Sequence, residues 1–241
     1  MKYVGSKAKL SKELIPIIQK YIDDNNIKIY IEPFVGGANV IDKIKCEKRI
    51  GIDIDSLVID LFQGYNKDLE LPYLPTKEHY YDVRDNPNKY DKVYRSAILL
   101  FASYNARVYG GCYGAYAKTK NGTIRNYFQE AKRNFEKQLP LLKDIVFING
   151  DYRELKTPTK CVIYCDPPYQ SGIGYKQDFN HNEFWNWVRE KSKNNIVLVS
   201  EYNAPKDFKV IWEQPIKTHM NNRNKLEKVE RLFILDYNKQ R

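Results

Sequence analysis

The sequence Asp166-Pro167-Pro168-Tyr169 brings together a carboxylate, two proline carbonyls and an aromatic ring. It follows the apolar run 162–165, which we interpret as a buried strand, so these groups lie at the strand's carboxyl end, where open α/β sheets bind ligands. Neither proline can donate an N–H, so the backbone here offers mainly acceptors. Such groups suit a planar ring whose exocyclic NH2 must be held and made nucleophilic.

A second candidate site is built around Gly36 and Gly37, which follow a predicted strand over residues 27–34. Glycines allow a ligand to approach the backbone, and a helix that starts here would offer free N–H groups. Asp53 lies in the next predicted strand, residues 49–54, near its end, where a carboxylate can accept hydrogen bonds from ribose hydroxyls. The spacing is not G-x-G-x-x-G, and an ordinary strand-to-helix turn with a capping aspartate explains the same residues equally well.

The elements that would position these groups alternate between strand and helix at both ends of the chain. Because parallel strands need crossover connections, this alternation predicts an α/β domain with a parallel sheet. The expected strands are 27–34, 49–54, 144–149, 160–165 and 195–200, the expected helices are 11–22, 38–45, 56–62 and 183–193, and residues 209–212 and 229–236 are expected to form an antiparallel pair.

The alternation stops between residues 63 and 143, which we expect to form a second lobe inserted into a domain of residues 1–62 and 144–241. Two helices are expected in this lobe, over 90–103 and 125–139. The segment between them interleaves glycines, tyrosines and basic residues, which is typical of a hairpin or loop at the surface.

The chain carries a formal charge of +10, from 40 Lys and Arg against 30 Asp and Glu, and its pI is near 9.2. Such an excess favours a polyanionic partner, because phosphate contacts release counterions. A lysine-rich protein that only needs a soluble surface has the same composition. Composition alone therefore leaves both interpretations open.

Composition also argues against several classes of protein. No apolar run approaches the length of a membrane span, and the first residues lack the apolar segment of a signal peptide. The four cysteines show no metal-binding spacing, so we expect reduced thiols, no metal ion and a cytoplasmic location; they are Cys46, Cys112, Cys161 and Cys165.

Five short motifs occur in the order and spacing of a known family: Tyr3-Val4-Gly5-Ser6-Lys7, Glu32-Pro33-Phe34-Val35-Gly36-Gly37, Gly51-Ile52-Asp53, Gly150-Asp151-Tyr152 and Asp166-Pro167-Pro168-Tyr169. Together they resemble the Dam-type (alpha-group) DNA adenine-N6 methyltransferases, most closely the short bacteriophage and prophage members. The resemblance extends to the late segments Ser200-Glu201-Tyr202-Asn203 and Glu230-Arg231-Leu232-Phe233. It implies a Rossmann-like mixed seven-stranded sheet, with a mainly helical target-recognition lobe that carries a hairpin and is inserted between the second and third strands.

The resemblance implies S-adenosylmethionine as the cofactor and double-stranded DNA as the substrate. The family's third glycine is replaced by Ala38, whose methyl group should narrow the approach to the backbone slightly without abolishing binding. The implied cofactor contacts are Tyr3 and Lys7, with Lys7 near the cofactor's carboxylate; Phe34 and Gly36 along its methionine side; Asp53 at its ribose hydroxyls; Asp151 and Tyr152 beside its adenine; and Asp166, which would face both cofactor and target amine.

The implied reaction is methyl transfer to N6 of an adenine that has been turned out of the duplex. This nitrogen is a poor nucleophile because its lone pair is delocalised into the ring. Asp166 and the carbonyl of Pro167 would accept its two hydrogens, Pro168 would supply a second rigid carbonyl, and Tyr169 would stack on the base. Such an in-line transfer depends on positioning and charge stabilisation and requires no metal.

The implied DNA-binding surface is the basic part of the insertion. Residues 104–143 contain eight Lys and Arg against two Glu. We expect four of these cations to contact phosphates or guanine edges, namely Arg107, Lys118, Lys120 and Arg125, while Tyr109, Tyr113 or Tyr116 could stack near the vacated base position and the loop 221–225 could reach a further phosphate.

Two alternatives share part of this pattern. N4-cytosine methylation also uses an exocyclic amine, although cytosine enzymes often have Ser at the position of Asp166. A catalytically silent DNA-binding protein of the same fold is the second, but it would have no reason to retain both Asp53 and Asp166. The implied setting is restriction-modification or protection of phage or host DNA, with a cognate restriction endonuclease as a functional partner. The recognition sequence is not assigned, because Tyr113-Gly114-Ala115-Tyr116 departs from the Phe-Asn-Val-Pro run of GATC readers.

Overall fold

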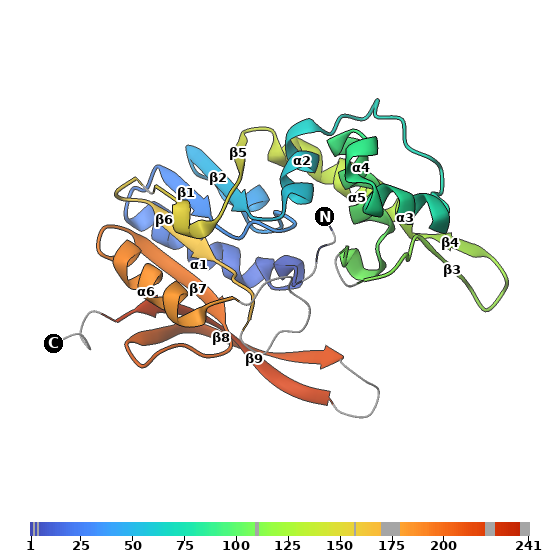
Figure 1. The fold of residues 1–241 in the computed structure, drawn as a ribbon. Helices are drawn as coiled ribbons and strands as arrows, with labels where there is room; N and C mark the ends of the chain where they lie inside the picture. The colour runs from blue at the N-terminus through green and yellow to red at the C-terminus, as the bar shows by residue number, and fades with distance from the viewer. Residues whose placement is uncertain are drawn as a thin grey trace.

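A seven-stranded mixed sheet forms the centre of the protein, as the computed structural model shows (Figure 1). The structure describes residues 1, 3, 5–108, 111–156, 158–169, 179–219 and 225–236, without the side chains of 217–219 and 225–227. The sheet order is β5-β2-β1-β6-β7-β9-β8, with β1 at Ile29–Glu32, β2 at Lys48–Asp53, β5 at Ile145–Asn149, β6 at Val162–Cys165, β7 at Ile196–Glu201, β8 at Phe208–His219 and β9 at Lys225–Leu235. The mixed seven-stranded sheet predicted from the sequence is therefore confirmed.

The five strands β5, β2, β1, β6 and β7 run parallel, which brings their carboxyl ends to one edge of the sheet. Glu32 at the end of β1 lies beside Gly51 of β2, and Ile31 lies beside Ile163 of β6. The segments that follow β1, β2 and β6 are distant in sequence, but they begin side by side at the same edge of the sheet. The register of the strands therefore brings the predicted motifs together in space.

The two faces of the sheet are covered by different helices because successive strand residues point in opposite directions. Tyr30 and Tyr164 face one apolar cluster with α1 (Ser11–Asp24) and α2 (Ser56–Gly64), whereas Ile163 faces a second cluster with α6 (His181–Ser192). Strand β6 is buried along its whole length. Continuous burial is what a central parallel strand requires, and it explains the unbroken apolar run in the sequence.

The antiparallel pair β8–β9 extends beyond the sheet. Its pairing runs from Phe208↔Leu235 to His219↔Lys225, whereas β9 contacts β7 only between Val199↔Phe233 and Glu201↔Arg231. Figure 1 shows the outer half projecting as a two-stranded ribbon past the carboxyl edge. The ribbon therefore brings residues of β9 close to the end of β6.

The helix predicted over residues 38–45 is wrong. Only a short 3₁₀ turn, Ile41–Lys43, is present there. Gly36 and Ala38 both have positive φ, at 45° and 54°, and such left-handed residues interrupt a right-handed helix. The chain after β1 is instead a folded loop, and this loop forms part of the cavity described below.

The insertion is mainly helical and carries a small hairpin, as expected. Its helices are α3 (Lys77–Asp85), α4 (Lys92–Ala102) and α5 (Tyr127–Leu142), and its hairpin joins β3 (Tyr116–Lys118) to β4 (Ile124–Asn126). Helix α3 was not predicted. Helix α5 begins two residues later than predicted, because Asn126 ends β4 and caps the helix by accepting a hydrogen bond from the N–H of Gln129 at 3.0 Å.

The insertion shares its core with the sheet domain. Phe135 of α5 is fully buried, and its ring lies 6.0 Å from Phe62, 5.1 Å from Tyr65 and 5.7 Å from Phe101. These residues belong to one apolar cluster that continues to the face of the sheet at Tyr30. The division of the chain into residues 1–62 plus 144–241 and 63–143 stays a prediction, since the core runs through both parts.

Candidate active site

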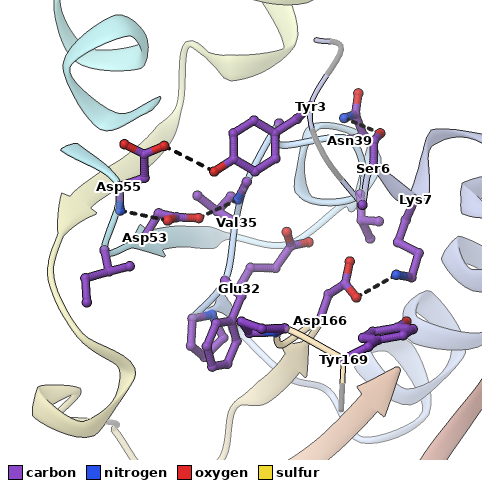
Figure 2. Close-up of a pocket in the computed structure, with 18 of the residues that line it drawn as sticks. Tyr3, Ser6, Lys7, Glu32, Val35, Asn39, Asp53, Asp55, Asp166 and Tyr169 are labelled. Atoms are coloured by element: carbon purple, nitrogen blue, oxygen red, sulfur yellow. Dashed lines mark hydrogen bonds and ion pairs between the residues drawn. The ribbon is translucent and has the colours of Figure 1, made fainter. Parts of the chain in front are cut away.

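A cavity of about 1270 Å³ lies at the carboxyl edge of the sheet (Figure 2). The loops after β1, β2, β5 and β6 line it together with the amino-terminal segment. Most of the site residues predicted from the sequence line this cavity: Tyr3, Lys7, Phe34, Gly36, Asp53, Arg107, Asp151, Tyr152, Asp166, Pro168 and Tyr169. Pro167 is not among the lining residues.

Asp53 is held at the end of β2 by backbone donors from two segments. Its Oδ2 accepts the N–H of Gly36 at 2.8 Å and its Oδ1 accepts the N–H of Asp55 at 2.9 Å. Burial raises the pKa of Asp53 to about 6, and the two N–H donors oppose that rise. The carboxylate is thus fixed in orientation, with acceptor capacity left for a hydroxyl ligand.

Asp55, two residues further along the chain, has a different role. Its Oδ2 accepts a hydrogen bond from the hydroxyl of Tyr3 at 3.3 Å (Figure 2). Its Oδ1 accepts the N–H of Leu57 at 3.2 Å, which caps α2. Asp55 therefore starts a helix and holds Tyr3 over the loop after β1.

That loop requires a glycine at position 36. A Cβ atom on Gly36 would lie 2.9 Å from Cδ1 of Tyr3, closer than real Cβ contacts, and the residue has a positive φ. Ala38 also has a positive φ and is fully buried. The family has a glycine at position 38. A glycine adopts the left-handed conformation without strain, which gives a physical reason for the family's preference.

An aromatic wall closes the side of the cavity next to β5. The ring of Phe34 lies 5.2 Å from Tyr152 and 5.9 Å from Phe179. Asp151 caps the short turn at Tyr152 and pairs with Arg153 at 2.6 Å, which lowers the pKa of Asp151. Flat aromatic faces next to a fixed carboxylate can hold a heteroaromatic ring and its amine.

The amino-terminal segment is held against the loop after β1 by Asn39. Its side-chain amide donates to the carbonyl of Met1 and to Oγ of Ser6, both at 2.9 Å. Ser6 also accepts the N–H of Ala8 at 3.2 Å and thereby caps the 3₁₀ turn Lys7–Lys9. The amino-terminal segment therefore places Lys7 in the cavity next to Asp166, which comes 159 positions later in the sequence.

Lys7 and Asp166 form a buried ion pair. Nζ of Lys7 lies 2.6 Å from Oδ1 of Asp166, and the two side chains are 9% and 20% exposed (Figure 2). Burial raises the pKa of Asp166, against the opposing charge of Lys7. The resemblance implies that Lys7 lies near the cofactor's carboxylate, whereas in this structure its ammonium pairs with Asp166.

Tyr169 is held on two sides. Its hydroxyl donates a hydrogen bond to Glu230 of β9, and its ring meets the ring of Tyr202 edge to face at 4.6 Å. The Lys7 ammonium lies 4.5 Å from the centre of the Tyr169 ring. The phenol ring is thus fixed beside the carboxylate of Asp166.

Sequence reasoning missed two buried acids of the cavity, Glu32 and Glu230, which are 3% and 2% exposed. Glu32 accepts the hydroxyl of Tyr30 at 2.7 Å, and burial raises its pKa well above the usual value. Both residues stood within motifs used for the resemblance. The sequence did contain a signal for them, since each glutamate lies in a segment predicted to be a strand. Carboxylates are rarely fully buried unless they are paired, so an acid buried in a strand indicates a functional or ion-paired position.

The residues predicted to bind DNA differ in their surroundings. Lys118 and Lys120 are exposed on the β3–β4 hairpin, which projects from the insertion (Figure 1). Arg125 is engaged by both oxygens of Glu130, at 2.8 and 2.9 Å. Tyr113 donates its hydroxyl to the carbonyl of Pro75 at 2.6 Å, which makes it a structural residue of the lobe.

Tyr116 is exposed, so it keeps the surface position that a contact with DNA requires. Tyr109 and residues 221–224 lie outside the described residues, and so does the side chain of Lys225. Their predicted contacts with DNA therefore stay predictions.

The cavity suits S-adenosylmethionine, which carries a sulfonium, an amino group, a ribose and an adenine. Its lining contains the carboxylates of Glu32, Asp53 and Asp166 and the aromatic wall at Phe34 and Tyr152. The described residues contain no group of three or more His, Cys, Asp or Glu able to hold a metal ion. Within the same residues, no helix is long and apolar enough to cross a membrane.

The sheet and the chemistry of the cavity are those of an S-adenosylmethionine-dependent methyltransferase. Residues 3–213 match the family of D12 class N6 adenine-specific DNA methyltransferases, and the chain belongs to this family. It is accordingly an enzyme that methylates adenine N6 in DNA with S-adenosylmethionine as the methyl donor.

Known proteins similar to this chain are type II and modification methyltransferases. The type II methyltransferase M.MjaIII of Methanocaldococcus jannaschii is 28% identical over 85% of this chain and 84% of its own length. The modification methylase StsI of Streptococcus sanguinis is 27% identical over 82% of this chain, which spans 32% of that longer protein.

Similar solved structures have low sequence identity. The rRNA methyltransferase aviRa from Streptomyces viridochromogenes is 10% identical, with a TM-score of 0.42 over 95% of this chain and 84% of its own. A dimethyladenosine transferase from Plasmodium falciparum is 11% identical, with a TM-score of 0.41 over 93% of this chain and 62% of its own.

Proposed function

We propose that this chain methylates an adenine that has been turned out of a specific sequence in duplex DNA, and that residues 166–169 hold the base. One observation carries the proposal: Asp166 and Tyr169 lie together on the wall of a cavity with the chemistry of a methyl donor's site, at the carboxyl end of β6. A base inside a duplex cannot reach such a recessed group, so it must leave the stack.

The carboxylate of Asp166 accepts one hydrogen of N6, and a carbonyl of the Pro167-Pro168 segment, of which Pro168 lines the cavity, accepts the other. This favours a pyramidal nitrogen whose lone pair points toward the donor. When bound, S-adenosylmethionine supplies a methyl group on a positively charged sulfur. Tyr169 stacks on the adenine, and its fixed hydroxyl and ring edge limit the orientations of the base.

The cofactor is held by groups that differ in chemistry. Asp53 accepts the ribose hydroxyls, Tyr152 contacts the adenine ring, and Asp151 receives its amine. The fixed carboxylate at Asp53, with two backbone N–H donors already in place, supports this assignment. The loop at Gly36 and the ring of Tyr3 face the methionine part.

The insertion delivers the DNA. Lys118 and Lys120 on the β3–β4 hairpin contact the duplex, and Arg107 lies where the insertion meets the cavity. Arg125 contributes less, because its guanidinium is already paired with Glu130.

The biological role is DNA modification that protects against a restriction endonuclease with the same recognition sequence. The names of the relatives, a type II methyltransferase and a modification methylase, support this role. The enzyme acts in the cytoplasm, where DNA and reduced thiols occur together, and its four cysteines are unpaired.

The experiment is a methyl-acceptance assay with purified protein and labelled S-adenosylmethionine, on unmethylated plasmid DNA and on RNA, followed by nucleoside analysis. We expect N6-methyladenine from DNA only. Methylcytosine as the sole product, or transfer to RNA alone, would contradict the proposal. Base-modification sequencing of the product then gives the recognition sequence.

The role of Asp166 is tested by Asp166→Asn. This variant should bind DNA normally in a gel-shift assay but transfer no methyl group. Asp85→Asn, in an exposed pair with Arg84 on α3, is the matched control and should leave the rate unchanged. Undiminished transfer by Asp166→Asn would show that the carboxylate has no part in the reaction.

A further inference from the structure

Glu230 lies beside the catalytic groups although it comes from the far end of the chain. Its side chain is 2% exposed, on the part of β9 that extends past β7. It accepts the hydroxyl of Tyr169, and its Oε1 lies 3.6 Å from Nζ of Lys7. One buried carboxylate thus contacts two groups that flank Asp166.

Lys7 occupies the positions that the target base needs. Its ammonium pairs with Oδ1 of Asp166 at 2.6 Å and lies 4.5 Å above the ring of Tyr169. In the reaction proposed above, the carboxylate must accept a hydrogen from N6 and the ring must stack on the adenine. The contact between Lys7 and Asp166 therefore has to loosen when the base enters.

A buried ammonium moves only if another acceptor receives it, since an unpaired buried charge is strongly destabilising. Glu230 is that acceptor by position. The distance from Lys7 to Glu230 needs to shorten by only about 1 Å to become a charge-assisted hydrogen bond. A small side-chain shift then exchanges one carboxylate for the other.

We propose that Glu230 is a positioning residue for methyl transfer: it fixes the ring of Tyr169 through its hydroxyl and receives the Lys7 ammonium when the target amine takes its place at Asp166. The inference rests on the proposed function. It adds the group that keeps Lys7 paired while Asp166 serves the substrate.

The charges of the cluster agree with this exchange. Burial alone would lower the pKa of Lys7, but Asp166 and Glu230 together raise it above the usual value, so the ammonium stays charged. Burial raises the pKa of Glu230, and the charge of Lys7 opposes that rise. Asp166 and Glu230 both face the Lys7 ammonium. The carboxylate that Lys7 does not engage is free to accept a hydrogen bond from the substrate or from Tyr169.

The test compares Glu230→Gln with Glu213→Gln. Glutamine keeps the size of the side chain and an acceptor for the Tyr169 hydroxyl, but it removes the charge that receives Lys7. Glu213 is the matched control because it lies on β8, is 57% exposed and pairs with Arg231 at 3.0 Å. Both variants should keep the melting temperature and the affinity for S-adenosylmethionine of the unchanged protein.

With unmethylated plasmid DNA as the substrate, Glu230→Gln should lower kcat about 10- to 100-fold, the size of effect of losing a charge-assisted hydrogen bond. The KM for DNA should stay within about twofold, because the DNA-binding surface is untouched. Glu213→Gln should match the unchanged protein in both constants. A loss of cofactor affinity equal to the loss of kcat would instead indicate a structural role and overturn the inference.

A double-mutant cycle with Lys7→Met makes the test specific. If Glu230 acts through Lys7, adding Glu230→Gln to Lys7→Met should lower kcat much less than it does in the unchanged protein. Fully multiplicative effects would overturn the inference. If Glu230→Gln does not fold, Glu230→Asp carries the same cycle, because it keeps the charge but withdraws it by one methylene.

The two proposals fail in distinguishable ways. If the unchanged protein does not methylate adenine in DNA, the proposed function fails whatever Glu230 does. If the unchanged protein methylates adenine and Glu230→Gln does so equally fast, only the role of Glu230 is refuted.

Discussion

The N–H of Gly36 donates a hydrogen bond to Oδ2 of Asp53 at 2.8 Å, which joins the loop after β1 to the end of β2. The two residues are seventeen positions apart in sequence and neighbours only because β1 and β2 pair in parallel. The hydrogen bond fixes the acid that is expected to bind the ribose and the loop expected to bind the methionine part with respect to each other. Changes at either residue should therefore alter cofactor binding.

The affinity for S-adenosylmethionine should fall as the pH drops below about 6. Burial raises the pKa of Asp53 to about 6, and the protonated acid is a poorer acceptor for ribose hydroxyls. The dissociation constant should rise by up to about tenfold per pH unit below that value. Calorimetric titration between pH 5 and 8 measures it, and Asp53→Asn should bind weakly with a much flatter pH profile.

The same group has the opposite effect on the stability of the cofactor-free protein. Its folded-state pKa is raised, so the folded protein binds this proton more tightly than the unfolded chain does. The contribution of Asp53 to stability should therefore increase as the pH falls from about 6 towards about 4. Denaturant unfolding of the cofactor-free protein at pH 6.5 and pH 5 measures this change in the free energy of unfolding. If Asp53→Asn showed the same change between the two pH values as the unchanged protein, the assigned pKa would be contradicted.

Gly36→Ala should weaken cofactor binding more than its backbone strain alone explains. The substitution costs about 1–2 kcal/mol for a left-handed alanine, and its methyl also displaces the ring of Tyr3, 2.9 Å from the new atom. Gly122→Ala is a matched control, because Gly122 also has a positive φ, but no atom of the described residues lies within 4 Å of the position that its Cβ would take.

Both variants should lose similar stability in denaturant unfolding, but only Gly36→Ala should lose cofactor affinity, by tenfold or more on an order-of-magnitude scale. Equal cofactor affinities in the two variants would show that Tyr3 does not shape the site. The pair separates the strain of the backbone from the contact with the ring.

The sequence predicted the site where each functional group directly follows a buried strand. Asp53 and Asp166 were found in this way, because parallel strands bring their carboxyl ends to the same edge. It did not predict that Lys7 pairs with Asp166, 159 positions away, or that Glu230 joins them. The contacts of Glu230 depend on β9 lying between β7 and β8, an order that the sequence pattern does not reveal.

Local errors had local causes. Helix α3 was not predicted because it is short and lies between two helix-breaking residues, Pro75 and Pro87. Both prolines lie outside the helix, which starts after its cap Thr76. The helix predicted over 38–45 failed because nothing in an alanine shows that Ala38 has a positive φ. Backbone conformations imposed by neighbouring segments are outside the reach of residue patterns.

Removing charge from the β3–β4 hairpin should weaken DNA binding and reduce its dependence on salt. Lys118 and Lys120 are exposed, so the double variant Lys118→Gln/Lys120→Gln should reduce the slope of log affinity against log salt by about 2, about 1 for each phosphate contact. Lys132→Gln, which loses only a pair with Glu136 on α5, should leave the slope unchanged. Fluorescence anisotropy at several salt concentrations measures both, and equal slopes would exclude the hairpin as a phosphate-binding element.

Phe135→Ala should destabilise the whole protein and not the insertion alone. Phe135 is fully buried against Phe62, Tyr65 and Phe101, so its loss opens a cavity in a core shared with α2, at a cost of about 3–5 kcal/mol. Leu141→Ala, on the same helix but 48% exposed, should cost less than about 0.5 kcal/mol.

Phe135 belongs to the apolar cluster on one face of the sheet, and Trp185 and Trp187 of α6 belong to the cluster on the other face. Because both clusters share the sheet, calorimetry of Phe135→Ala should show one unfolding transition at a lower temperature, and the fluorescence of the two tryptophans should change in that same transition. Two separate transitions, with the later one unshifted, would show that residues 63–143 unfold as an independent domain. The predicted division of the chain would then correspond to two units that unfold separately. A single shifted transition would instead mean that the inserted lobe and the cavity at the carboxyl edge of the sheet are stabilised by the same side chains, so that loss of packing in the lobe also destabilises the proposed site of methyl transfer.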